Sequence, residues 1–176
     1  NNLTIIIALG SMPLAFTYPL MKRYTYWPQF FLGITFNYGL ILGWICIKES
    51  LEIVPFLFYF GAIFWTLGYD TIYGFQDIKD DEIIGLKSTS IKFKKKPYFF
   101  LALCYLIFFL CIASVGVLMK FNFMYFAFLI IPLLHLFIHQ IRKLDIDDPN
   151  KCLKIFKTNN LFGLIVFVNL LIGKLY

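Results

Sequence analysis

The chain has 176 residues, of which 60% are hydrophobic and 15% charged, and its mean hydropathy is +0.77. Soluble globular proteins are nearer half apolar and about a quarter charged, so this composition argues against a soluble domain and indicates an integral membrane protein. The formal net charge of +6 does not indicate nucleic-acid binding, because the basic residues lie in the gaps between apolar segments. The four cysteines form no CxxC pair and three lie in apolar runs, which indicates packing rather than zinc or disulfides.

Six apolar runs are long enough, or nearly so, to cross a bilayer as helices, which takes about 20 residues each. None shows the alternation of a membrane β-barrel strand. The last run is short, although Lys174 could reach the interface. We therefore expect an all-α membrane bundle that forms a single domain over residues 1–176. The runs cover residues 3–21, 28–47, 53–75, 97–119, 121–141 and 158–173.

Lysine and arginine are distributed unequally between the two ends of these spans. Alternate connections belong to the same side of the membrane, and one side carries thirteen of the sixteen basic residues. The other side carries only Lys48, Lys120 and Lys174. The positive-inside rule places the richer side in the cytoplasm. Seven of the ten acids lie on the same side, so a polar site is expected there.

The most informative segment is YDTIYGFQDIKDDEIIGLKST, residues 69–89. Asp70 follows seventeen uncharged residues and is expected at the membrane edge, where an ionisable side chain is a functional candidate. If the helix continues, Asp70, Asp77 and Asp81 fall within an arc of roughly 60° on one face. Stacked carboxylates repel, and Mg²⁺ held jointly with substrate phosphates would offset that repulsion. The alternative is a solvated helix end with lysine counterions.

The segment GLKST, residues 85–89, follows the three aspartates directly. Lys87 and Ser88 supply a cation and a hydroxyl that suit phosphate oxygens. The spacing is not that of a Walker A loop, so the pentapeptide alone is weak evidence for phosphate binding.

An earlier connection on the same side reads YPLMKRYTYWPQ, residues 18–29. Tyr18 and Lys22 are four residues apart, and Arg23 follows, so this loop could meet an anionic head group. The alternative is a positive-inside anchor with an aromatic belt.

Several polar residues lie inside the spans. His135 and His139 are four apart, but without the glutamate of an HExxH motif they favour interhelical hydrogen bonding, or a position near the membrane interface, over a metal site. Asn37 is expected to bond to a neighbouring helix. Asn159 and Asn160 are expected to cap the last helix.

These segments together resemble a known family. Residues 69–89 resemble the second aspartate-rich motif of the UbiA-type prenyltransferases, with its following GxKST element. Residues 18–29 resemble the tyrosine–lysine stretch that lies upstream of that motif. The segment KCLKIFKTNNLFGLIVF, residues 151–167, is similar to the last loop and helix of the 4-hydroxybenzoate polyprenyltransferases. The likeness extends from about residue 17 to the end of the chain.

The resemblance implies nine transmembrane helices around a central cavity. It also implies Mg²⁺-dependent transfer of a polyprenyl group from polyprenyl diphosphate to 4-hydroxybenzoate, in ubiquinone biosynthesis within the lipid bilayer. By this analogy the catalytic, metal-binding residues are Asp70, Asp77 and Asp81, and the diphosphate-binding residues are Tyr18, Lys22, Arg23, Lys87 and Ser88.

The family's first aspartate-rich motif, of the NDxxDxxxD type, does not occur in this sequence. The sequence begins at Asn1 inside an apolar stretch, and its six spans match helices four to nine of the family. We therefore expect a fragment that holds half of the metal site and is inactive alone.

Three alternatives to this function stay open. The first is the same fold with another acceptor, such as a naphthoate, homogentisate, haem or a chlorophyllide. The second is a small transporter with an acidic cytoplasmic ion site. The third is a non-catalytic membrane fragment that only assembles with a partner. A bacterial inner membrane is the expected location, with the mitochondrial inner membrane as the alternative.

Overall fold

The apolar runs form helices because lipid offers no hydrogen-bond partner to backbone N–H and C=O groups. The computed structural model describes residues 2–175 and contains no strand within them. Six helical segments are long and apolar enough to cross a membrane, which confirms the expected all-α membrane fold. They are Asn2–Tyr24, Pro28–Lys48, Ile53–Gly74, Pro97–Leu118, Phe123–Ile141 and Pro149–Leu175.

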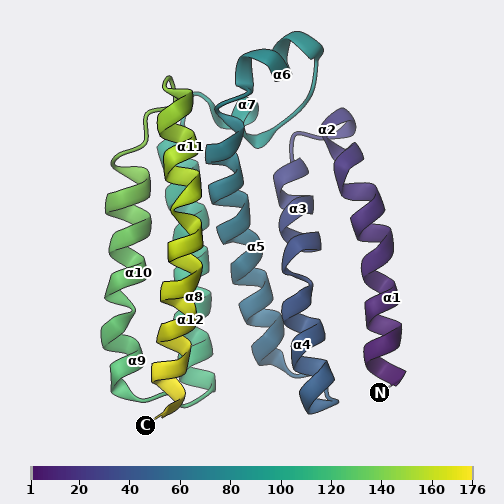
Figure 1. Ribbon diagram of the computed structural model, residues 1–176, viewed down its shortest axis with the longest axis vertical. Coiled ribbons are helices and arrows are strands. Elements are labelled where there is room, and N and C mark those ends of the chain that lie inside the picture. The colour runs from purple at the N-terminus through teal and green to yellow at the C-terminus, as the bar shows by residue number, and fades with distance from the viewer. Residues whose placement is uncertain (1, 176) are drawn as a thin grey trace.

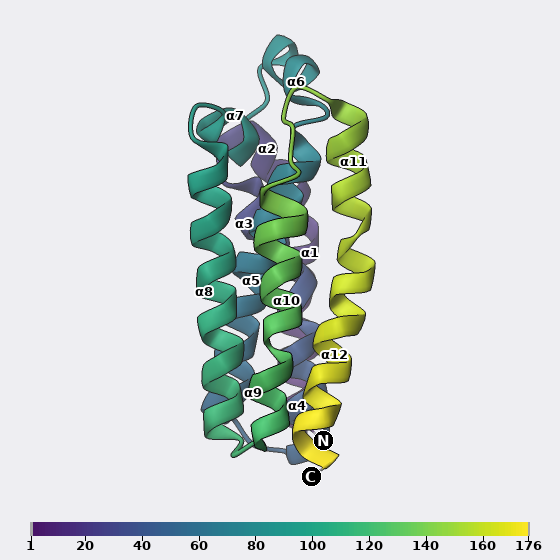
Figure 2. The ribbon, with the colours of Figure 1, turned by 90° about the vertical axis from the view of Figure 1, so that its left-hand side faces the viewer.

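Successive spans run in opposite directions, and short connections join them at the two ends of the bundle (Figures 1 and 2). Several spans are built from two or three consecutive elements, and η2 is a turn of π-helix. In chain order the elements are α1 (Asn2–Thr17), η1 (Tyr18–Leu20), α2 (Met21–Tyr24), α3 (Pro28–Asn37), α4 (Gly39–Lys48), α5 (Ile53–Gly74), α6 (Ile78–Ile84), α7 (Thr89–Phe93), α8 (Pro97–Leu118), α9 (Phe123–Phe128), α10 (Ile130–Leu134), η2 (His135–Ile141), α11 (Pro149–Lys157) and α12 (Asn159–Leu175).

One end of the bundle, drawn at the top of Figure 1, carries α2, α6, α7 and the start of α11. We call it the basic face and define it by residues 18–29, 75–96 and 142–157. It holds thirteen of the sixteen lysine and arginine residues, as the alternation of the spans predicts.

Helix α5 lies between α3 and α8 and makes its most extensive contacts with these two helices. Small residues permit this close packing, as they do in membrane bundles generally. A Cβ atom on Gly68 would overlap the ring of Tyr105, which is fully buried. The Tyr105 hydroxyl donates to Gln140 Oε1 at 2.6 Å, so the ring has little freedom to move away.

Two polar clusters tie the helices together inside the apolar bundle. Asn37 Nδ2 donates to Thr66 Oγ1 at 2.7 Å, which confirms the expected bond between neighbouring helices. Asn159 Oδ1 accepts from both Trp65 Nε1 and Gln140 Nε2, each at 2.9 Å. Asn159 therefore joins α5, η2 and α12 and does not cap the last span as expected, because that span already begins at Pro149.

The histidine pair behaves differently from the expectation of interhelical hydrogen bonding. The rings of His135 and His139 stack with centroids 5.0 Å apart. Among residues 2–175, His135 Nε2 and His139 Nδ1 are buried without a hydrogen-bond partner. Stacking on the same helix holds each ring beside the other instead of against a polar group across the bundle.

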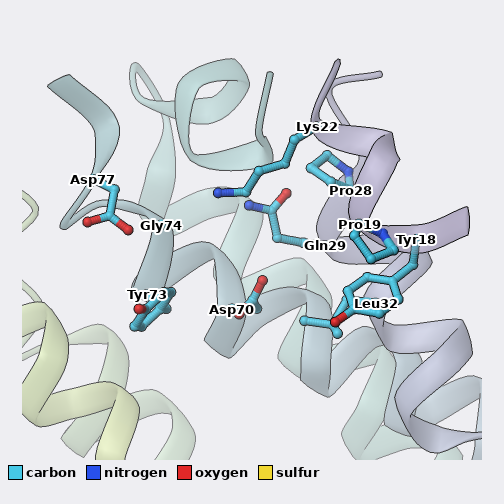
Figure 3. A pocket seen from close by; sticks show the side chains of 10 residues that line it. All are labelled: Tyr18, Pro19, Lys22, Pro28, Gln29, Leu32, Asp70, Tyr73, Gly74 and Asp77. Atoms are coloured by element: carbon cyan, nitrogen blue, oxygen red, sulfur yellow. The ribbon is translucent and has the colours of Figure 1, made fainter. Parts of the chain in front are cut away.

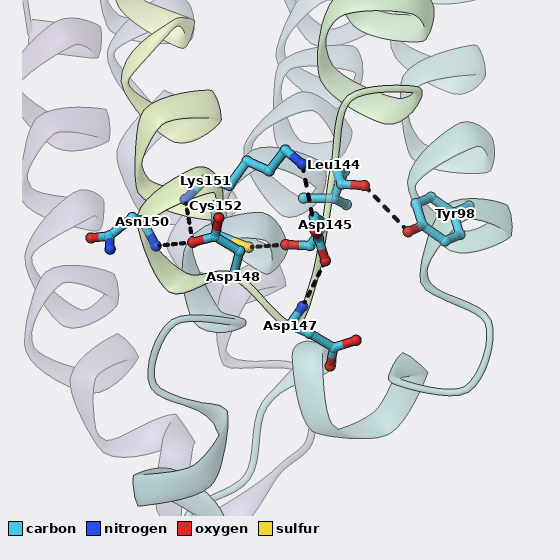
Figure 4. Close-up of polar contacts among 8 residues, drawn as sticks. All are labelled: Tyr98, Leu144, Asp145, Asp147, Asp148, Asn150, Lys151 and Cys152. Atoms are coloured by element: carbon cyan, nitrogen blue, oxygen red, sulfur yellow. Dashed lines mark hydrogen bonds and ion pairs between the residues drawn. The ribbon is translucent and has the colours of Figure 1, made fainter.

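The last span begins earlier than hydropathy indicates, because α11 starts at Pro149 rather than near residue 158 (Figure 4). Asp148 caps this helix by accepting from the backbone N–H groups of Asn150 at 3.0 Å and Lys151 at 3.1 Å. Cys152 and Ile155 are buried on one side of α11. The lysines on its other side lower the mean hydropathy and hide the helix from a search for apolar runs.

We expect Gly68→Ala to lower the stability of the bundle by about 1–3 kcal/mol, because the new methyl group overpacks the contact with Tyr105. Thermal unfolding in detergent measures the change. Gly43→Ala is the matched control, since a Cβ atom there meets no atom within 4 Å, and alanine favours a helix over glycine. Equal melting temperatures for the two variants would contradict the packing described here.

Candidate active site

A pocket of about 340 Å³ opens at the basic face between η1, the start of α3 and the end of α5 (Figure 3). It brings one cation, Lys22, together with two carboxylates, Asp70 and Asp77. Figure 3 shows Lys22 extending from one wall while both aspartates lie on the α5 side. The lining residues are Tyr18, Pro19, Lys22, Pro28, Gln29, Leu32, Asp70, Tyr73, Gly74 and Asp77.

The two prolines of the pocket shape the wall opposite α5. Pro19 stands in the first turn of η1, and Pro28 opens α3 at a position where a missing N–H costs nothing. The connection between them carries Lys22 in the short helix α2. This geometry brings Tyr18 and Lys22 to the pocket, as the sequence predicted for a polar site on this face.

The acidic segment does not continue α5, which corrects the expectation of one long helix. Helix α5 ends at Gly74, and Asp77 stands at the start of the separate helix α6. Asp70 and Asp77 still line one pocket, but a turn of the chain brings them together rather than a shared helix face. Asp81 lies in α6 and is not among the residues that line the pocket.

A hydrogen bond from α7 lies at the end of α5. Ser90 Oγ donates at 2.8 Å to the carbonyl oxygen of Thr71, which in a continuing helix would accept from the N–H of Phe75. That N–H donates to Ile72 O at 3.3 Å instead, and the N–H of Gln76 donates to Tyr73 O at 3.1 Å, which tightens the last turn. Gly74 permits the approach, because a side chain there would overlap the Ser90 hydroxyl.

Asp81 is connected to the pocket through Lys22. The carboxylate is 6% exposed and its Oδ2 lies 3.5 Å from Lys22 Nζ. That oxygen has no hydrogen-bond partner among the described residues. A buried charge without a hydrogen bond is costly, so Lys22 balances Asp81 on one side while it faces Asp70 and Asp77 on the other.

The GLKST segment lies beside the pocket but does not line it. The backbone N–H of Lys87 donates to Lys22 O at 2.8 Å, and Lys87 Nζ donates to Tyr24 O at 3.3 Å. Ser88 is fully buried and caps α7 by accepting from the N–H of Ile91 at 3.2 Å. Its assignment to diphosphate binding stays a prediction, because the structure gives this hydroxyl a capping role.

Arg23 also lies outside the pocket, in the last turn of α2, with its side chain exposed. Among the lining residues with a polar group on the side chain, Gln29 and Tyr73 were not singled out from the sequence. Gln29 is 3% exposed and accepts from the N–H of Thr89 at 3.0 Å. Tyr73 contacts Phe156 of α11 with ring centroids 4.8 Å apart. A polar residue in the first turn of an apolar run, and an aromatic ring one turn after Asp70, are the signals that could have identified them.

The acidic residues suit a hard cation only in part. Within residues 2–175, no three acidic, histidine or cysteine side chains lie close enough together to hold a metal. Asp70 and Asp77 nevertheless present carboxylates to one pocket. Such a pair fits Mg²⁺, which is commonly bound by one or two carboxylates together with substrate phosphates.

Comparisons with known proteins identify similar sequences. The mitochondrial 4-hydroxybenzoate polyprenyltransferase of Bos taurus is 43% identical over 176 residues, covering 99% of this chain and 47% of that protein. The Homo sapiens protein of the same name is 43% identical over 177 residues, covering 100% of this chain and 47% of that protein. The 4-hydroxybenzoate geranyltransferase 2 of Lithospermum erythrorhizon is 38% identical over 183 residues, covering 100% of this chain and 58% of that protein.

The chain spans about half the length of the mammalian relatives that it matches. No solved structure matches it. Residues 1–171 match the UbiA prenyltransferase family, which covers nearly every element of the bundle and the whole pocket. The chain therefore belongs to the UbiA prenyltransferase family, as its aspartate-rich segment predicted.

Proposed function

We propose that the whole protein transfers a polyprenyl group from polyprenyl diphosphate to 4-hydroxybenzoate, in ubiquinone biosynthesis. The observation that carries this proposal is the pocket that joins Lys22, Asp70 and Asp77 at one end of a lipid-embedded bundle. Such a pocket can hold a diphosphate at the membrane surface while an isoprenoid chain extends along the apolar helices. The names of the relatives supply the acceptor.

Asp70 and Asp77 would hold Mg²⁺ jointly with the diphosphate. When bound, Mg²⁺ would neutralise the charge that develops on the diphosphate as it leaves. The two carboxylates support this role because they face the same pocket and nothing but Lys22 among the lining residues offsets their charge. Asp81, the third aspartate of the predicted site, would contribute through its contact with Lys22.

The basic residues near the pocket would act on the diphosphate as it leaves. Lys22 stands between Asp81 and the pocket, so a bound diphosphate could take it as a donor and stabilise developing charge. Lys87, in the GLKST segment, would have to give up its hydrogen bond to the carbonyl of Tyr24 before it could bind a phosphate oxygen. Arg23 is exposed on the same short helix as Lys22. Tyr18 offers a hydroxyl to the same substrate group.

An aromatic wall on the α5 side would face the allylic carbon. Tyr73 lines the pocket, and its ring contacts Phe156, which also contacts Tyr69. A cation against such rings gains about 0.5–2 kcal/mol per contact. This placement orients the prenyl group away from water and toward the bilayer.

We place the protein in an inner membrane, bacterial or mitochondrial, with the basic face toward the cytoplasm or the matrix. The excess of lysine and arginine on that face supports this orientation. The mammalian relatives carry the word mitochondrial in their names, which favours the second location over the bacterial one that we expected first.

We expect Asp70→Asn and Asp77→Asn each to lower kcat/KM of the full-length protein by about 100-fold or more, because each removes a charge that holds the diphosphate site. Product formation from polyprenyl diphosphate and 4-hydroxybenzoate is followed by mass spectrometry in liposomes. Chelation of Mg²⁺ should abolish it. Asp80→Asn is the matched control, since Asp80 is exposed and does not line the pocket. Full activity in the Asp70 and Asp77 variants would refute this site.

The same assay with a panel of acceptors tests the identity of the substrate. Product with 4-hydroxybenzoate alone is expected. Product only with a naphthoate, homogentisate, haem or a chlorophyllide would retain the reaction and change the acceptor. Ion flux into proteoliposomes without prenyl transfer would support a transporter instead.

We expect the Lys22–Asp81 pair to couple stability and diphosphate binding. Lys22→Gln leaves the buried Asp81 carboxylate unpaired, and a double-mutant cycle with Asp81→Asn should show a coupling of about 0.5–3 kcal/mol in thermal unfolding. Lys22→Gln should also raise KM for polyprenyl diphosphate. The control cycle uses Lys94 and Glu82, an exposed pair on the same face whose coupling should be about 0–1 kcal/mol. Indistinguishable couplings in the two cycles would rule out the role given to Asp81.

A further inference from the structure

A second cavity, of about 480 Å³, lies across α3 from the candidate active site. Its walls come from the first turns of α3, from α5 and from the connection before α3, and Thr25 supplies the only side-chain hydroxyl. We call it the Trp27 groove and define it by its lining residues, which are Thr25, Trp27, Phe30, Phe31, Phe64 and Leu67.

The Trp27 groove and the active-site pocket use different sides of the same helix. At 100° per residue, Phe30 and Phe31 fall on the side of α3 opposite to Gln29 and Leu32. The first two residues line the groove and the last two line the pocket. No acidic side chain lines the groove, so the groove is separate from the carboxylates that define the candidate active site.

The upper end of the Trp27 groove has a cationic rim. Lys92 Nζ lies 4.5 Å from the centroid of the Trp27 ring. The next residue, Phe93, packs its ring edge-on against Trp27 with centroids 5.6 Å apart. Lys95 and Lys96 come two and three residues after Phe93 and are exposed on the basic face. Lys94 is excluded from the rim because it pairs with Glu82.

The apolar groove and its cationic rim together fit a molecule that has both a hydrocarbon chain and a negatively charged group. The groove lies within the membrane-spanning part of α3 and α5, where hydrocarbon chains surround the helices. The rim lies on the basic face, at the end of the spans where lipid head groups are expected. An occupant therefore needs a hydrocarbon chain along Phe30 and Phe64, and a negative charge near Lys92.

We propose that the Trp27 groove binds an anionic phospholipid, with its acyl chain in the groove and its phosphate head group at Lys92, Lys95 and Lys96. Charge complementarity selects an anionic head group over a zwitterionic one, since each lysine near an anionic lipid surface strengthens binding by about fivefold. A bound lipid would fill the space between α3 and α5 and support α3 from the side that faces away from the active site.

Quenching of Trp27 fluorescence by lipids with brominated acyl chains tests the proposal. The full-length protein is placed in nanodiscs of phosphatidylcholine that contain increasing fractions of brominated phosphatidylglycerol or of brominated phosphatidylcholine. Subtraction of the Trp27→Phe signal removes the emission of Trp44 and Trp65. We expect half-maximal quenching at an at least fivefold lower fraction of the anionic lipid than of the neutral one.

Lys92→Gln should weaken the preference for the anionic lipid about fivefold. Lys157→Gln is the matched control, because Lys157 is an exposed lysine of the basic face on α11, away from the groove. Equal quenching by the two lipids, or an equal loss in both lysine variants, would overturn the proposal. Displacement of the anionic lipid by a small molar excess of polyprenyl diphosphate would also overturn it, by showing that the groove holds substrate.

Discussion

The candidate active site depends on the turn that ends α5, where the hydroxyl of Ser90 donates to the carbonyl of Thr71. Gly74 leaves room for this contact. The chain turns away at Phe75, and the acidic segment folds back over the basic face as α6. Without that turn, Asp77 would stay on the same face of the helix as Asp70 but lie about 10 Å further along its axis.

Two loops that are far apart in sequence form the site together. The N–H of Lys87 binds the carbonyl of Lys22, and the N–H of Thr89 binds the side chain of Gln29. These backbone contacts hold the GLKST segment against the first loop, so that Lys22 can meet Asp81 on one side and the pocket on the other. Carboxylates at a membrane edge are costly, and this arrangement offsets their charge while keeping one cation accessible to a substrate.

The interior of the bundle uses polar side chains for a different purpose. Asn37 joins α3 to α5, and Asn159 joins α12 to both Trp65 and Gln140. These groups are fully or nearly fully paired, which is what makes them tolerable in lipid. They set the positions of α3 and α5, and α3 then separates a charged pocket on one side from the apolar Trp27 groove on the other.

The sequence by itself determined the features that depend on local composition: six apolar spans, the basic face, the aspartate-rich segment and the family to which they belong. Hydropathy and charge patterns depend only on residues that are neighbours in the sequence, so both are visible without a structure. Only the tertiary structure decided where α5 ends and what meets that end, because the Ser90 hydroxyl at the turn comes from nineteen positions further along the chain. It likewise decided that Gln29 lines the pocket, since that side chain is held by Thr89, from a distant segment. The helix α11 escaped detection because its buried residues become apparent only when it packs against the bundle.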